Sequence, residues 1–125
     1  MIYLDTHVVV WLYTGLTEKF SEPVRRLIND DEVCISPMVR LELQYLHEIQ
    51  RVTDDEHRIV SDLANRIGLH VCTEPFDRIV TRALAYSWTR DPFDRLIVAH
   101  AALQDSILVS KDRTILTNYA HARWQ

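Results

Sequence analysis

The chain has 125 residues, of which 47% are hydrophobic and 26% are charged, and its formal net charge is −4. This length fits a single domain over residues 1–125 with one hydrophobic core. The excess of acidic residues argues against a protein that binds nucleic acid through a broad basic surface. It does not exclude a nuclease, because a carboxylate site that holds cations is acidic by necessity.

No segment has the features of a targeting or membrane-spanning sequence. The longest uncharged apolar stretch, residues 6–15, is too short to cross a bilayer. The N-terminus lacks a basic region followed by an apolar run, so we expect no export signal. Cys34 and Cys72 lie far apart within apolar runs, which predicts buried structural thiols in a reducing cytoplasm. No Cys/His spacing indicates a zinc site.

Short apolar runs recur along the chain and predict buried β-strands. They are rich in β-branched residues and largely lack polar alternation, as expected for strands covered on both faces. The predicted strands are residues 1–4, 33–35, 69–72 and 107–109. Residues 119–125 carry a weaker pattern, which leaves open a fifth strand at the sheet edge.

Helical patterns lie between these runs. Proline follows serine closely at Ser21-Glu22-Pro23 and at Ser36-Pro37, as is typical of helix starts, and Gly68 marks a stop. The predicted helices begin near residue 22 and then span residues 38–49, 56–67, 76–88 and 92–104. Strands that alternate with helices form right-handed crossovers. The sequence therefore predicts a three-layer α/β fold with a central parallel sheet of four or five strands flanked by helices.

Two acidic residues follow predicted strands. Asp5 ends the first strand, and Asp112 comes shortly after the fourth. In open α/β sheets ligands bind beyond the carboxyl ends of the strands, so both side chains would stand at the rim of a site. Either residue could instead cap a helix or form a turn, which is a common role of Asp after a strand.

Glu42 lies on an apolar helix face. Its neighbours three and four residues away in both directions are largely apolar. A carboxylate there either faces the core, where an unpaired charge costs several kcal/mol or shifts its pKa, or faces a lined cavity. Two alternatives remain: Glu42 borders the apolar face, or it pairs with Arg40 or Arg51.

The densest motif is the segment Asp-Pro-Phe-Asp-Arg over residues 91–95. Asp91 is a good helix N-cap and Pro92 a good first helical residue. Asp94 is followed at helical spacing by Ile97 and Val98, so it heads an inward-facing stripe and would project towards the strand ends. We therefore assign Asp91 to capping and Asp94 to the site.

Converging carboxylates repel one another unless a cation lies between them. Hard divalent cations with oxygen ligands, such as Mg²⁺ and Mn²⁺, suit this arrangement. The chemistry that follows is activation of water for in-line attack on a phosphodiester. The candidate metal ligands and catalytic residues are Asp5, Glu42, Asp94 and Asp112. The chain contains no glycine-rich dinucleotide or phosphate-binding motif.

These motifs resemble PIN-domain proteins, and most closely the VapC-type toxins of bacterial toxin–antitoxin pairs. The resemblance covers the whole chain and rests on Leu4-Asp5-Thr6, Glu42, the segment 90–99 and Leu108-Val109-Ser110-Lys111-Asp112. It implies a parallel sheet flanked by helices, dependence on Mg²⁺ or Mn²⁺, and endonucleolytic cleavage of RNA, with the family's acids at the four positions above. It also implies a homodimer, inhibition by a VapB-type antitoxin, and a role for Thr6 and Ser110 in orienting carboxylates or metal-bound waters.

Basic residues bracket the two later acids, at Arg90, Arg95, Lys111 and Arg113. We predict that some of them contact RNA phosphates, although each could equally be solvated or pair with a nearby acid. The apolar residues 11–13 either pack in the core or line a groove for an amphipathic antitoxin segment.

Other functions fit the sequence less well. A phosphatase with an aspartyl nucleophile commonly uses a second acid two residues after the first, and His7 stands there instead. A receiver-like signalling domain would carry its acceptor Asp at a later strand. The main alternative is a catalytically inactive PIN-like RNA-binding or scaffold protein. The presence of all four acids argues against that alternative.

Overall fold

Five short strands form one parallel sheet in the order β3-β2-β1-β4-β5. The computed structural model describes all 125 residues. The strands are β1 (Ile2–Leu4), β2 (Val33–Ile35), β3 (His70–Val71), β4 (Ile107–Val109) and β5 (Ala122–Arg123). The structure confirms the predicted parallel sheet and settles its strand number at five. The C-terminal segment thus supplies the edge strand that its sequence pattern left open.

Seven α-helices and a short 3₁₀-helix connect and flank the strands. They are α1 (Thr6–Thr14), η1 (Thr17–Lys19), α2 (Glu22–Asp30), α3 (Pro37–Glu48), α4 (Glu56–Ile67), α5 (Phe76–Ala83), α6 (Pro92–Ala102) and α7 (Arg113–Asn118). The longest of them, α3 and α4, have 12 residues each. No helix is therefore long and apolar enough to cross a membrane.

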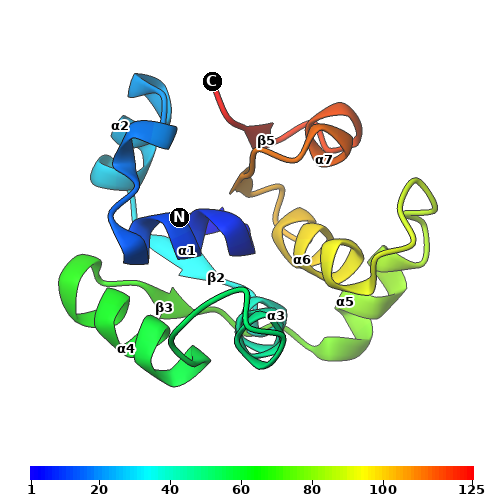
Figure 1. Cartoon of the computed structure of the whole chain (residues 1–125). Helices are drawn as coiled ribbons and strands as arrows, with labels where there is room; N and C mark the ends of the chain where they lie inside the picture. The colour runs from blue at the N-terminus through cyan, green and yellow to red at the C-terminus, as the bar shows by residue number, and fades with distance from the viewer.

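The direction of the crossovers explains the layers. The chain steps from β1 to β2 and β3 on one side, and then returns to place β4 on the other side of β1. Right-handed crossovers in opposite directions put their helices on opposite faces of a sheet. Accordingly, α1 and α2 cover one face, and α5 and α6 cover the other (Figure 1). The predicted three-layer α/β architecture is confirmed.

The core lies between the sheet and these two helical layers. Every residue of β1 and β2 is buried, which explains why these strands contain no polar alternation. In α6 all residues from Ile97 to Ala102 are buried, including the stripe that Asp94 heads. Of the two cysteines, Cys34 is fully buried and Cys72 is partly buried.

Two helices are absent from the sequence expectations. The helix α1 begins directly after Asp5 and ends at Gly15, whose positive φ of 77° is the left-handed conformation that glycine adopts most easily. The helix α7 has six residues, too few to show a helical period. The predicted helix 76–88 is also too long, because α5 ends at Ala83.

Candidate active site

The site lies at the carboxyl edge of the sheet, where the strand order reverses between β1 and β4. Open α/β sheets bind their ligands at such reversal points because the neighbouring crossovers diverge there. Asp5 follows β1, and the segment Ser110–Asp112 follows β4. The amide of Asp5 donates to the carbonyl oxygen of Val109 at 3.0 Å, which ties the two strand ends together.

Asp5 is only 3% exposed, and both of its carboxylate oxygens accept hydrogen bonds. Oδ1 accepts from the Thr6 amide and thereby caps α1, and Oδ2 accepts from the Ser110 hydroxyl, each at 2.8 Å. Burial raises the pKa of Asp5, while His7 and these hydrogen bonds act in the opposite direction. The carboxylate is therefore fixed in orientation but costly to keep charged.

Asp112 caps α7 and belongs to the same hydrogen-bond network. Its Oδ1 accepts from the Ile115 amide at 3.1 Å. Its own amide donates to the Ser110 hydroxyl at 3.0 Å, so the fully buried Ser110 connects the two acids that follow β1 and β4. The cap and site alternatives for Asp5 and Asp112 are thus compatible, since each caps a helix and lines the same cleft.

Glu42 projects from α3 towards the start of α1. Its Oε1 accepts a short hydrogen bond from the Thr6 hydroxyl. Burial raises the pKa of Glu42, the Thr6 bond lowers it, and Asp5 and Asp91 raise it further. Arg40 instead pairs with Glu56 at 3.0 Å, and no ion pair joins Glu42 to Arg51. The pairing alternatives for Glu42 are therefore wrong, and the carboxylate faces a cavity.

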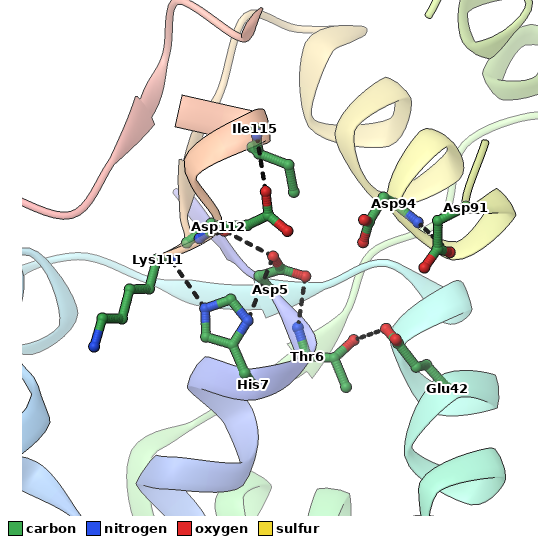
Figure 2. A network of polar contacts seen from close by, with 10 residues as sticks. Asp5, Thr6, His7, Glu42, Asp91, Asp94, Lys111, Asp112 and Ile115 are labelled. Atoms are coloured by element: carbon green, nitrogen blue, oxygen red, sulfur yellow. Dashed lines mark hydrogen bonds and ion pairs between the residues drawn. The ribbon is translucent and has the colours of Figure 1, made fainter. Parts of the chain in front are cut away.

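Asp94 lies across the cleft from Asp112, in the first turn of α6 (Figure 2). The Asp91 Oδ1 caps this helix by accepting from the amides of Phe93 at 2.8 Å and Asp94 at 3.3 Å. The Asp94 carboxylate itself accepts no hydrogen bond within 3.5 Å and turns towards Asp5 and Asp112 (Figure 2). Burial, followed by the surrounding carboxylates, raises the pKa of Asp94 to about 7.

The four acids share one open cleft of about 530 Å³. They reach it from four separate elements, and no Lys or Arg side chain forms an ion pair with any of them. Besides the four acids, the lining residues are Thr6, His7, Val10, Trp11, Leu46, Arg51, Val52 and Asp91. An oxygen-rich, partly buried set of carboxylates that has no Lys or Arg partner suits a hard divalent cation, which prefers charged oxygen ligands. The residues present therefore fit Mg²⁺ or Mn²⁺.

His7 belongs to this site, although the sequence assigned it no role there. Its Nε2 accepts from the Lys111 amide at 2.9 Å, so the proton of the neutral ring is on Nδ1. Nδ1 lies 3.6 Å from Asp5 Oδ2. Burial lowers the pKa of His7, and the neighbouring carboxylates partly offset this. The available signal was its position, two residues after Asp5.

The four basic residues predicted to contact RNA lie outside the cleft lining. The Arg95 guanidinium donates to the carbonyl oxygens of Ala83 and Leu84 at the end of α5, and Arg90 donates to Ser87. The Lys111 ammonium lies 5.8 Å from the centre of the Trp11 ring, and Arg113 is exposed. The basic side chain that lines the cleft is Arg51, which the sequence offered only as a partner for Glu42.

One wall of the cleft is aromatic. Trp11 is partly buried and packs with Phe20 and Trp124, at ring-centre distances of 6.2 and 5.8 Å. Lys19 and Lys111 both place their ammonium groups over the Trp11 ring. The cleft therefore combines an acidic floor with an aromatic wall whose outer edge is basic.

The sequence matches the PIN domain family over residues 2–121. The fold is similar to VapBC2 from Rickettsia felis, with a TM-score of 0.70 and 19% identity over all of both chains. It is also similar to VapBC-1 from nontypeable Haemophilus influenzae (TM-score 0.68, 20% identity, 100% of this chain and 97% of that one). A toxin–antitoxin complex from Klebsiella pneumoniae is similar as well, with a TM-score of 0.68 and 15% identity. The match covers 98% of this chain and 96% of that one. No curated protein sequence matches.

Proposed function

Because the chain belongs to the PIN-domain family, we propose that it is an endoribonuclease that depends on Mg²⁺ or Mn²⁺. The observation that carries this proposal is the cleft in which Asp5, Glu42, Asp94 and Asp112 face one another without a neutralising side chain. Such a cluster costs stability in the absence of a ligand, so a function explains it better than a structural role does.

Asp5, Glu42 and Asp94 would hold the cation directly. Asp112 has one oxygen committed to the Ile115 amide and a second that remains for the cation or its waters. A bound divalent ion lowers the pKa of a coordinated water and stabilises the charge of the departing oxygen. The burial of these carboxylates favours cation binding, because charge–charge attraction is stronger away from bulk water.

The chain's own residues orient the carboxylates. Ser110 holds one oxygen of Asp5, and Thr6 holds one oxygen of Glu42. These hydrogen bonds limit side-chain rotation. Glu42 keeps one oxygen without a hydrogen bond, and each Asp5 oxygen, which accepts one hydrogen bond, keeps a second lone pair for a cation. His7, with its proton on Nδ1, faces Asp5 Oδ2, the oxygen that Ser110 also contacts. Through its Nε2 it also holds the backbone of Lys111 beside the cleft.

The substrate we propose is RNA. We also propose that the protein acts in the cytoplasm, where it would meet this substrate. Its phosphates would approach the cation at the acidic floor while a base meets the Trp11 wall. Arg51, in the cleft, is the first candidate for a phosphate contact. Lys111 lies over the Trp11 ring, and Arg113 lines a separate hollow together with Lys111 and Trp124. For Arg90 and Arg95 the role in RNA binding remains a prediction, since both are held by backbone carbonyl groups.

The similar structures support the proposal of an antitoxin partner. Because VapBC proteins and a toxin–antitoxin complex share this fold, we propose that the chain is the toxin of such a pair. A VapB-type antitoxin would hold it inactive, and the toxin would act as a homodimer. Residues 11–13 pack against the core and are only partly buried. Of the two roles that the sequence left open for them, we propose that they also contact an antitoxin segment, because Trp11 is partly exposed at the cleft.

Cleavage of labelled RNA by wild type and Asp94→Asn tests the function. Wild type should cleave with Mg²⁺ or Mn²⁺ and stop in EDTA. Asp94→Asn should lose at least about 100-fold in rate, because it removes a charged ligand from the cation. Asp77→Asn, at an exposed position on α5, is the matched control and should cleave normally.

Three results would contradict the proposal. Cleavage that persists in EDTA would exclude the metal-dependent mechanism. Equal rates for wild type and Asp94→Asn would indicate a contaminating nuclease or another site. Tight RNA binding without any cleavage would favour the inactive RNA-binding protein.

A further inference from the structure

A second cluster of metal-binding side chains lies apart from the acidic cleft. The Cys34 Sγ, a ring nitrogen of His70 and the Cys72 Sγ all lie within 4.8 Å of one another. None of these residues lines the cleft. Both cysteines are free thiols. The sequence spacing gave no sign of this cluster, because Cys34 lies 36 positions before His70 and 38 positions before Cys72.

The parallel register of the sheet brings the three side chains together. Cys34 on β2 stands beside His70 on β3, and neighbours in one row of a sheet project from the same face. His70 and Cys72 are two residues apart, so alternation directs them to the same face as well. The amide of Cys72 also donates to the Ile35 carbonyl at 3.0 Å, which continues the strand pairing to this residue.

Two thiols and one imidazole form a soft donor set that differs in kind from the four carboxylates. We propose that Cys34, His70 and Cys72 bind a thiophilic divalent cation, with Zn²⁺ as the ion that fits best. Tetrahedral zinc sites use these donors, with ligand atoms separated by roughly 3.5–4 Å. Small side-chain rotations close the remaining distance. Both thiols release their protons to solvent when the cation binds.

Met1 lies beside these three side chains. Its Sδ lies 3.2 Å from the Cys72 Sγ. The Met1 ammonium group is fixed by Asp31 at 3.0 Å, which holds the start of the chain beside β2. A cation at this position would link the edge strand β3 to β2 and to the beginning of β1. Its expected effect is therefore to stabilise the sheet edge.

Spectroscopic titration of the reduced, metal-free protein with Co²⁺ and Zn²⁺ tests the site. Co²⁺ should produce an intense thiolate charge-transfer band at one ion per chain, and Zn²⁺ should displace it. Carboxylates give no such band, so the acidic cleft cannot mimic the signal. At a free concentration about 100-fold above its Kd, Zn²⁺ should raise Tm by on the order of 10 °C.

Variants separate this site from the cleft. Cys72→Ser and His70→Gln should lose or strongly weaken the band, whereas Asp94→Asn and His57→Gln should keep it. Thermal unfolding of each metal-free variant shows whether it is folded. The proposal is overturned if wild type gives no thiolate band, if Cys72→Ser binds Co²⁺ as wild type does, or if Zn²⁺ leaves Tm unchanged. Formation of a Cys34–Cys72 disulfide at a rate that Zn²⁺ does not slow would also overturn it.

Discussion

Asp5 and Asp112 each use one carboxylate for two tasks. One oxygen accepts from a helix amide and caps α1 or α7, and the other is directed to the site. Substitution by Asn keeps an oxygen for the cap, whereas Ala removes both functions and costs about 1 kcal/mol of stability through the cap alone. Functional tests at these positions should therefore use Asn.

Asp94 differs from these two because its side chain has no hydrogen-bonded support. Its orientation comes from the helix start that Asp91 caps. Its pKa of about 7 means that near neutral pH a proton competes with a cation for this carboxylate. Among the four acids it is the one whose charge is least compensated by the protein.

Arg51→Gln should weaken RNA binding while leaving metal binding intact. One charge-assisted phosphate contact contributes about 1 kcal/mol, so we expect a rise in Kd of about fivefold and a shallower salt dependence. Binding should be measured in the Asp94→Asn background, where the RNA stays uncut. Arg78→Gln, at an exposed position on α5, is the matched control. Equal Kd values for the two variants would remove Arg51 from the binding surface.

Sequence patterns could predict which acids matter but not how they are held. Asp5, Asp94 and Asp112 follow strands or start a helix, and those positions are visible in the sequence. The Thr6–Glu42 bond joins residues 36 positions apart and depends on how α1 packs against α3. Arg51 reaches the cleft for the same reason, through tertiary packing that no local pattern records.

At the scale of elements, α1 and α7 show why short or largely apolar helices escape sequence analysis. The α1 segment begins Thr-His-Val-Val-Val, and β-branched residues have modest helix propensity. Several of its faces are covered, so it lacks the polar side that reveals an amphipathic helix. Both helices begin at a capping Asp, which was the signal available for each.

The helix α3, which carries Glu42, is fixed at its start by α6. The Ser36 hydroxyl caps α3 and lies 3.1 Å from Nδ1 of His100. His100 is 1% exposed, and its Nε2 has no hydrogen-bond partner. Burial lowers the pKa of His100, so its ring is neutral in the folded protein at neutral pH. The position of Glu42 thus depends on a buried, uncharged histidine.

This histidine predicts an acid-sensitive contribution to stability. The unfolded chain binds a proton at His100 near pH 6.5, whereas the folded state binds it only at lower pH. Stability from this group is therefore complete above about pH 6.5 and declines as the pH falls below that value. Asp5, Glu42 and Asp94 have raised pKa values and act in the opposite direction.

The contribution of His100 to stability is therefore measured by comparing wild type with a variant that lacks this histidine. Urea unfolding at pH 7.5 and 5.5 should show that His100→Gln loses less stability on acidification than wild type, by about 1 kcal/mol. The carboxylates are present in both proteins and cancel in the difference. An identical loss in the two proteins would show that His100 does not titrate on unfolding in this range.

For the whole molecule, the alternation of apolar runs and helical patterns was enough to predict a parallel three-layer architecture. It could not fix the fifth strand, because β5 has two residues and is defined by pairing with β4. Nor could it predict that β1 lies at the centre of the sheet. Strand order depends on crossover direction, which the local sequence does not specify.

Trp124, which follows β5, packs the last segment described against the start of the chain. Its ring packs against Trp11 and Phe20, and its carbonyl accepts from Ser21. Trp124→Ala should lower the free energy of unfolding by about 2–3 kcal/mol, because it removes a large aromatic contact and leaves a cavity. Deletion of the exposed Gln125 is the control. If urea unfolding of Trp124→Ala matches wild type, the C-terminal strand lies outside the cooperative unit.

The Ser110–Asp5 hydrogen bond joins residues 105 positions apart, and this separation has a consequence for protein synthesis. A chain growing on the ribosome makes β1 before β4, so Asp5 exists long before Ser110, which helps to orient it. Contacts of such long range form only after the intervening segments are available. A nascent chain whose β4 segment has not yet emerged from the ribosome therefore lacks the site. The order of synthesis itself delays the proposed nuclease until β4 has been made.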